Sequence, residues 1–439
     1  MSPFFIKAIQ LLLSLSLLII LHELGHFIPA RLFKTRVEKF FLFFDVKFAL
    51  FKRKVGETVY GIGWLPLGGY VKISGMIDES MDTEQMKTPP QPWEFRSKPA
   101  WQRLIIMLGG VTVNLILGFL IYMMVLFVWG KTTLSNDDLP YGLAPTPLAE
   151  ALGFKNGDEI LAVDGKPLEN ILDVNRYLLL RNVNTVDVMG KDGRSRVVPI
   201  PENFGDQMFQ SGEMFPLYPT SPALINSVVP NGPAAKAGLM ANDEIVGVNE
   251  TAVNNFANFT KALKTQGNNP FDLIVLRQGR LDTVSIQTNA EGKIGVLLQN
   301  SNIAFKTRTL SFSESIVEGF GHTYWTLYDY VSQFQYIFTK KGASQLGGFG
   351  AIGNLFPPVW DWRGFWTSTA LISIILAFMN VLPIPALDGG HVMFLLYELV
   401  TGRKPNDRFM EYAQMTGFFL LMALVLYANG NDLMRALFE

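Results

Sequence analysis

The sequence predicts a polytopic α-helical membrane protein with four transmembrane helices, a membrane-re-entrant β hairpin and a duplicated soluble insert. Of the 439 residues, 49% are hydrophobic and only 17% are charged, whereas soluble globular domains carry about 25% charged residues. Four long apolar stretches contain few or no Asp, Glu, Lys or Arg residues. A segment of ordinary soluble composition with an internal repeat separates the second stretch from the third.

Three of the four predicted spans are free of charge over their whole length. A helix needs about 20 mostly apolar residues to cross a bilayer. The clearest stretch runs from Leu104 to Gly130 and is bounded by Trp101 and Trp129, as expected of a helix with aromatic residues at both membrane interfaces. The other two cover residues 364–387 and 412–431.

The first span is interrupted by ionisable residues. Residues 8–21 are uncharged, and then His22, Glu23 and His26 fall within an apolar run that continues to about Ala30. A secretory signal peptide is the alternative for this N-terminal segment. We instead expect a retained transmembrane helix, because no small-residue cleavage site follows the apolar core.

Basic residues beside the spans predict how the chain crosses the membrane. They follow span 1, precede span 2 and lie between spans 3 and 4: Arg31, Lys34, Arg36, Lys39, Arg96, Lys98, Arg103, Arg403, Lys404 and Arg408. Loops rich in Lys and Arg stay in the cytoplasm. Both termini and the long middle segment are therefore predicted to lie outside.

The middle segment contains two copies of one pattern. GFKNGDEILAVDGKPL from Gly153 matches GLMANDEIVGVNETAV from Gly238 at an offset of 85 residues. Such self-similarity indicates two similar domains of about 80 residues each. In each copy a short apolar strand is followed by a helix-like stretch, at residues 168–180 and 253–263, and then by two strand-like runs.

Both copies resemble PDZ domains, the first more closely than the second. In the second copy, Asn242 and Glu250 stand where glycines are common. The predicted domains are a membrane segment (1–133), a first PDZ domain (134–218), a second PDZ domain (219–305), an amphipathic connecting segment (306–363) and a second membrane segment (364–439).

A further element is expected between spans 1 and 2. Residues 55–75 read VGETVYGIGWLPLGGYVKISG, in which glycine and aromatic residues alternate around Gly68 and Gly69. This pattern predicts a β hairpin that is too apolar for water. Exposed backbone is not tolerated in hydrocarbon, so the hairpin must lie beside a protein-lined cavity or pair with another strand.

The first span carries a metal-binding pattern. His22, Glu23 and His26 form HExxH in a chain that has only four histidines. On a helix, imidazoles four residues apart project from one face and can bind one zinc ion, with the glutamate as general base. Ionisable residues inside a span are costly and functional by default. This favours a zinc site over polar residues that merely face water at a helix end.

Asp388 is the best-placed remaining ligand. Two imidazoles and a water molecule leave a tetrahedral zinc ion one ligand short. Asp388 follows the uncharged third span after Pro383 and Pro385, each of which lacks a backbone donor and disturbs a helix. Spans 1 and 3 are predicted to run in the same direction, so His22 and Asp388 are expected in the cytoplasmic part of the bilayer.

Three other polar residues receive weaker interpretations. His391 is expected to support the site or to lie at the lipid interface, and His322 is expected at that interface. Asn114 lies in the middle of span 2, where we interpret it as a helix-packing residue.

HELGH in span 1, NVLPIPALDGG from Asn380 and the tandem PDZ insert together resemble the site-2 protease family of intramembrane zinc metalloproteases. The resemblance covers essentially the whole chain. It implies that His22, His26 and Asp388 bind one Zn²⁺ ion and that Glu23 is the catalytic acid/base.

The resemblance also implies substrate-binding residues and partners. Asn380, Pro383 and Pro385 match the motif associated with holding the substrate backbone, and Gly68-Gly69-Tyr70 resembles the family's re-entrant β element. The implied activity is cleavage within transmembrane segments of pre-trimmed proteins, such as anti-sigma factors in an envelope stress response and signal-peptide remnants. The implied location is a bacterial inner membrane, with the PDZ domains in the periplasm.

Composition and sequence pattern exclude a nucleic-acid-binding protein and leave two alternatives to the protease, a scaffold and a transporter. A net charge of -1 provides no basic field for nucleic acid, and the absence of cysteine excludes thiolate ligands and disulfides. A membrane-anchored scaffold with a structural zinc ion would also contain HExxH, but its fourth coordination position would be protein. A transporter using the broken third span is disfavoured because no repeat relates the membrane halves.

Overall fold

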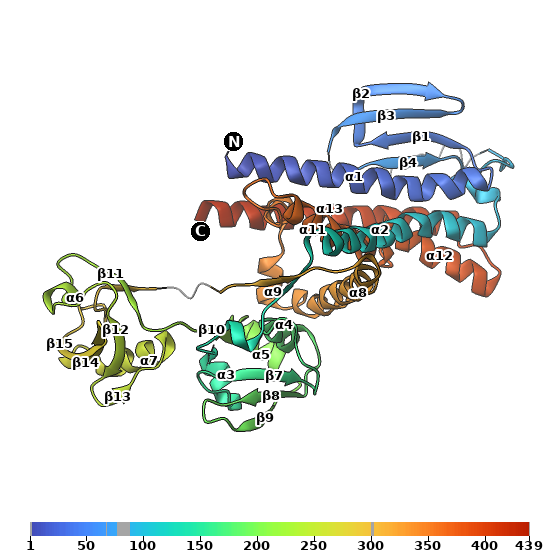
Figure 1. Cartoon of the computed structure of the whole chain (residues 1–439). Coiled ribbons are helices and arrows are strands. Elements are labelled where there is room, and N and C mark those ends of the chain that lie inside the picture. The colour runs from blue at the N-terminus through green and yellow to red at the C-terminus, as the bar shows by residue number, and fades with distance from the viewer. Residues whose placement is uncertain (1, 67, 77–87, 300–302, 439) are drawn as a thin grey trace. The chain divides into compact units, whose positions relative to one another are not determined.

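The computed structural model describes residues 2–66, 68–76, 88–299 and 303–438 (Figure 1). The chain forms two compact units, Met1–Gly130 with Thr309–Glu439 and, between them in sequence, Lys131–Arg308. The first is called the membrane unit below and the second the duplicated unit.

Four helices of the membrane unit have the length and composition needed to cross a bilayer. These are α1 (Pro3–Leu32), α2 (Ala100–Trp129), α11 (Trp362–Val381) and α13 (Asp407–Phe438). No other helix in the described ranges meets both conditions. The four predicted spans are therefore confirmed as helices.

Glycines bring α1 and α2 into close contact beside the HExxH pattern. A Cβ atom on Gly25 would lie 2.4 Å from the carbonyl oxygen of Gly109, and one on Gly109 would lie 1.9 Å from that of Gly25. A Cβ atom on Gly110 would lie 2.4 Å from Nε2 of His26. Small residues allow helix backbones to approach in this way within a membrane. These three glycines thus place α2 directly against the two imidazoles.

A four-stranded sheet follows α1, in place of the predicted hairpin. Its strands are β1 (Val37–Leu42), β2 (Phe44–Val55), β3 (Thr58–Leu65) and β4 (Tyr70–Ile73), in the order β2-β3-β1-β4. β3 pairs antiparallel with β2 and parallel with β1, and β4 pairs antiparallel with β1.

The prediction of a hairpin over residues 55–75 is therefore wrong in its pairing. Both edges of β3 are occupied by strands that precede it in sequence, so β4 pairs with β1 instead of β3. Gly68 and Gly69 consequently do not form the turn of a β3–β4 hairpin. β4 is left as an edge strand of the sheet.

The third span ends earlier than its uncharged stretch. α11 stops at Val381, residues 382–387 are non-helical, and α12 (Asp388–Thr401) begins at the predicted ligand. Pro383 and Pro385 explain the break because neither can donate a helical hydrogen bond. Gly389 allows the non-helical segment to pack closely on the start of α12, because a Cβ atom on Gly389 would lie 2.2 Å from the carbonyl oxygen of Leu382.

The connecting segment of the membrane unit is largely helical. It contains α8 (Phe312–Ile337), α9 (Lys340–Gln345) and α10 (Phe349–Gly353). α8 begins with a capping box between Ser311 and Glu314. Its aromatic side chains pack on α2 and α11 through the ring pairs Phe119–Phe320 and Phe334–Phe378.

The two copies in the duplicated unit share a succession of strand, short helix, strand, longer helix and three strands, to which the first copy adds α5 and the second adds β13. The first copy has β6 (Leu143–Pro145), α3 (Pro147–Leu152), β7 (Glu159–Val163), α4 (Asp173–Leu180), β8 (Thr185–Met189), β9 (Ser195–Pro199), α5 (Phe204–Ser211) and β10 (Leu217–Pro219). The second has β11 (Ile225–Val228), α6 (Pro233–Lys236), β12 (Glu244–Val248), β13 (Thr251–Ala252), α7 (Phe256–Gln266), β14 (Phe271–Arg277), β15 (Arg280–Ile286) and β16 (Val296–Leu298). Each copy has its own hydrophobic core. The predicted order of strand, helix and two strands is present in both.

The two departures from the glycine pattern have different structural outcomes. Asn242 adopts φ +69°, close to the φ +84° of Gly157 at the equivalent position of the first copy. Asparagine tolerates this left-handed conformation better than other non-glycine residues. Glu250, in contrast, does not share the positive φ of its equivalent Gly165. The first turn is therefore retained in the second copy, and the second turn is altered.

Candidate metal centre

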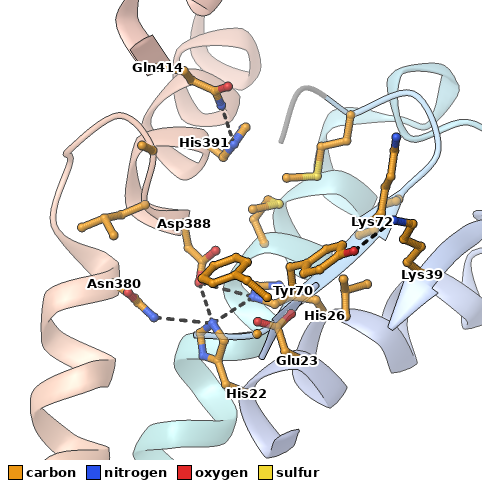
Figure 2. A pocket seen from close by; sticks show the side chains of 18 of the residues that line it. His22, Glu23, His26, Lys39, Tyr70, Lys72, Asn380, Asp388, His391 and Gln414 are labelled. Atoms are coloured by element: carbon orange, nitrogen blue, oxygen red, sulfur yellow. Dashed lines mark hydrogen bonds and ion pairs between the residues drawn. The ribbon is translucent and has the colours of Figure 1, made fainter. Parts of the chain in front are cut away.

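His22, His26 and Asp388 converge from opposite ends of the chain (Figure 2). Nε2 of His22 lies 3.4 Å from Oδ2 of Asp388, and Nε2 of His26 lies 3.3 Å from the same oxygen. The two Nε2 atoms are 3.3 Å apart. The described residues contain one such group of three possible metal ligands, and it is this one.

These three atoms have the spacing of a tetrahedral metal site. Ligands about 2.1 Å from a tetrahedral zinc ion lie about 3.4 Å from one another. Oδ2 of Asp388 is buried and makes no hydrogen bond of ordinary geometry, and a buried unpaired carboxylate oxygen is costly. A cation bound between the three side chains would remove that cost. The residues present therefore fit a zinc ion.

Glu23 lies beside this group without belonging to it. Its side chain is nearly buried, at 9% exposure, and lines the same cavity as the two imidazoles. Val71 of β4 lines the same cavity. The helix therefore places Glu23 next to His22, on the cavity that the edge strand also lines.

A cavity of about 360 Å³ opens at the three predicted ligands. Side chains from α1, the β sheet, the broken segment after α11, α12 and α13 line it. On the sheet side, the hydroxyl of Tyr70 donates to Asp45 at 2.7 Å and accepts from Lys39 at 3.2 Å. Figure 2 shows Tyr70 and Lys39 across the cavity from Asp388.

The residues predicted to bind substrate divide into two groups. Asn380, Gly69 and Tyr70 line the cavity, and the amide nitrogen of Asn380 lies 3.5 Å from Nε2 of His22. Pro383, Pro385 and Gly68 lie outside the cavity lining. The prolines instead shape the non-helical segment that leads to Asp388.

Several contacts of the histidines have no signal in the sequence. Nδ1 of His26 lies 2.8 Å from the carbonyl oxygen of Ile106, and Nδ1 of His22 lies 3.1 Å from the side-chain amide of Asn114. Both partners belong to α2. Asn114 lies in a conspicuous position for a polar residue, but the pattern of span 2 alone could not identify its neighbour.

The other two histidines lie outside the group of three. His391 lines the cavity one helical turn after Asp388, and its Nε2 lies 2.6 Å from the side-chain amide of Gln414 (Figure 2). His322 in α8 packs edge-on against the ring of Tyr122, with 4.5 Å between the ring centroids.

Comparison with known proteins places these motifs in a family. The model of peptidase family M50 matches residues 10–424. A regulator of sigma E protease from Haemophilus influenzae is 27% identical over 97% of this chain and 98% of its own length. The regulator of sigma-E protease RseP of Salmonella typhimurium is 29% identical over 97% of both chains. A Campylobacter jejuni protein provisionally named as a zinc metalloprotease is 26% identical over 99% of this chain and 95% of its own.

Proposed function

We propose a function from one premise: the chain belongs to peptidase family M50, the site-2 protease family. It is a zinc metalloprotease of the site-2 type, and its relatives include proteases that regulate sigma E. We infer that it cuts a peptide bond within the transmembrane segment of a membrane protein that another protease has already trimmed. The observation that carries this proposal is the convergence of His22, His26 and Asp388 beside Glu23.

In this proposal His22, His26 and Asp388 hold a single zinc ion. Zinc, when bound, supplies Lewis acidity, which polarises a carbonyl group and acidifies water. The Glu23 carboxylate accepts a proton from the attacking water and delivers it to the nitrogen of the leaving amine.

The edge strand β4 is the proposed binding site for the substrate backbone. A helical substrate hides its carbonyl groups in its own hydrogen bonds, so the segment to be cut must become extended. An extended segment can add to a free sheet edge, which satisfies its backbone groups. Among the described strands, β4 pairs with β1 alone, and Tyr70 and Val71 line the same cavity as Glu23.

Asn380 is proposed to hold the substrate backbone from the other side, because its amide reaches the cavity near His22. Gly69 lets the start of β4 pack closely on its neighbours, because a Cβ atom there would lie 2.5 Å from Ile19 and 2.7 Å from the carbonyl oxygen of Phe41. Pro383 and Pro385 contribute indirectly, by ending α11 before the ligand. Gly68 precedes the strand and has no proposed contact with substrate.

The duplicated unit is proposed to select substrates before cleavage. We assign its two copies as PDZ domains on the periplasmic side of a bacterial inner membrane, where they would exclude proteins with bulky outer domains. The substrates would then include an anti-sigma factor of an envelope stress response, and signal-peptide remnants. The relatives that regulate sigma E support this assignment.

Cleavage of a single model transmembrane segment by the purified chain in detergent or liposomes tests the proposal. Cleavage should occur within the apolar segment, stop on addition of a zinc chelator and resume when zinc is restored. A membrane-anchored scaffold or a transporter would leave the segment intact under all three conditions. Cleavage that is insensitive to chelation would contradict the proposed metal centre.

A further inference from the structure

Asn114 is a buried polar side chain in the middle of a membrane-spanning helix. It is fully buried, at 0% exposure, and lies within the uncharged stretch of α2. Burying an amide in apolar surroundings costs free energy unless it is hydrogen-bonded. Its Oδ1 atom has no hydrogen-bond partner among the described residues, while its Nδ2 atom lies 3.1 Å from Nδ1 of His22. The main side-chain contact of this costly residue is thus a proposed zinc ligand.

The ring orientation of His22 determines what Asn114 must supply. Nε2 of His22 faces His26 and Asp388, so Nδ1 is the nitrogen that points away from the proposed metal. A neutral imidazole carries one proton, and a nitrogen that binds a metal cannot hold it. The proton therefore lies on Nδ1 when zinc is bound, and it needs an acceptor.

The side-chain amide of Asn114 can accept that proton after a simple rotation. The oxygen and nitrogen of an asparagine amide have almost the same shape, and their assignment depends on the hydrogen bonds around them. Turning the amide by about 180° brings Oδ1 to the position that Nδ2 occupies beside Nδ1 of His22. In the unrotated state Nδ2 instead donates to Nδ1, which suits a His22 whose proton lies on Nε2.

The second imidazole is held by the same helix in an equivalent way. Nδ1 of His26 lies 2.8 Å from the carbonyl oxygen of Ile106, a natural acceptor for its N–H group. Ile106, Gly110 and Asn114 are spaced four residues apart on one face of α2. Gly110 leaves room for both rings, because a Cβ atom there would lie 2.4 Å from His26 and 2.5 Å from His22.

We propose that Asn114 is a positioning residue of the metal centre, whose amide oxygen accepts the Nδ1–H of His22 and so aims Nε2 at the zinc ion. Outer partners of this kind fix the tautomer and orientation of a ligating histidine. The competing explanation is helix packing, because asparagine also joins transmembrane helices. This inference rests on the proposed zinc site and extends it to α2.

Zinc affinity of the purified full-length chain, measured by competition with a chromophoric chelator, tests the inference without using activity. Asn114→Leu keeps the branched shape of the side chain at Cγ, with somewhat larger volume, and removes the acceptor, so it should weaken zinc binding by about 10–100-fold. Asn114→Asp keeps an acceptor oxygen and should bind zinc far better than the leucine variant. Ser373→Ala is the matched control, because it removes only the 2.7 Å hydrogen bond from Ser373 to the backbone oxygen of Asn114.

If the leucine and aspartate variants lost zinc affinity equally, Asn114 would act in packing and the inference would be overturned. The same holds if Ser373→Ala lost as much zinc affinity as Asn114→Leu. Unchanged affinity in Asn114→Leu would also overturn it. If the wild-type chain bound no zinc, the proposed function itself would fail. Nitrogen NMR of the zinc-loaded wild-type chain needs no variant, since only four histidines must be assigned. A proton on Nδ1 of His22 is expected, and an unprotonated Nδ1 would contradict the inference.

Discussion

Buried carboxylates in the two units have different kinds of partner. In the duplicated unit, Asp158 is bonded to Arg196, and Asp243 accepts bonds of 2.8 and 2.6 Å from Arg277. Each aspartate also accepts a backbone N–H from three residues earlier, at 2.7 and 2.8 Å. In the membrane unit, Asp388 instead faces two imidazole nitrogens, and its Oδ2 has no hydrogen bond of ordinary geometry.

The two kinds of partner indicate two roles: the arginine-paired aspartates stabilise the fold, and Asp388 is available to bind a cation. A carboxylate that is fully paired with an arginine and a backbone N–H stabilises its own loop. A carboxylate whose oxygen is left for a cation costs stability until the cation binds. Substitutions in the two units should therefore have different effects: loss of metal and turnover in the membrane unit, and local unfolding in the duplicated unit.

The largest effect is expected for Asp388→Ala. Two imidazoles alone hold a zinc ion poorly, and alanine offers no charged oxygen ligand. The variant should lose both zinc and activity, which metal analysis of the purified chain and a cleavage assay would measure. His391→Ala is the matched control one turn along α12 and should retain the metal. Full zinc stoichiometry in Asp388→Ala would reassign the third ligand, with His391 as the next candidate.

Glu23→Gln should keep zinc and lose turnover. Glutamine preserves the size of the side chain but cannot accept the proton of the attacking water, so the rate should fall by about 10²–10⁴-fold. Zinc content should equal that of the wild-type chain, because Glu23 is not one of the three converging ligands. Cleavage near the wild-type rate in metal-loaded variant protein would refute the role given to Glu23.

Deletion of residues 134–305 should change substrate selection and leave catalysis intact. The flanking strands β5 (Lys131–Thr133) and β17 (Lys306–Arg308) pair antiparallel, with Thr133 opposite Lys306, so a short linker can join them. The shortened chain should cut a transmembrane segment with a large outer domain as well as the trimmed form. If it bound zinc but cut neither form, the duplicated unit would be needed for delivery or catalysis.

The smallest effect is expected for Asp243→Asn. Loss of hydrogen bonds to a charged partner should destabilise the second copy by about 1–3 kcal/mol, without changing the cleavage of a trimmed substrate. Hydrogen exchange of the full chain would locate the loss in residues 219–305. Asp282→Asn is the control, because Asp282 is exposed and lies 3.5 Å from the same arginine. Equal hydrogen exchange in the two variants would contradict the stabilising role proposed for Asp243.

Acid should reproduce the effect of Asp243→Asn. The hydrogen bonds from Arg277 lower the pKa of Asp243 below its ordinary value. A carboxyl group with a lowered pKa stabilises the fold fully above its unfolded pKa of about 3.9 and loses that contribution as the pH falls towards the folded value. Amide protection factors in the second copy, which correct for the intrinsic pH dependence of exchange, should therefore fall below about pH 4 in the wild-type chain and change less in Asp243→Asn.

The sequence by itself determined the features that depend on composition or on local spacing. The four spans follow from length and apolarity, because a helix in a bilayer satisfies its own backbone and needs no distant partner. The two imidazoles of HExxH share a helix face because they are four residues apart. The repeat and the family resemblance also depend on linear patterns, and the match to peptidase family M50 confirmed that resemblance.

Only the tertiary structure decided the features that depend on distant partners. The hairpin predicted over residues 55–75 is wrong, and β3 pairs with β1 and β2 instead. The turn signal at Gly68 and Gly69 is local, whereas the partners of a strand depend on the whole sheet. The contacts of Ile106 and Asn114 with the histidines exist because α1 and α2 cross at Gly25 and Gly109. A crossing point depends on the packing of two helices, which neither helix specifies alone.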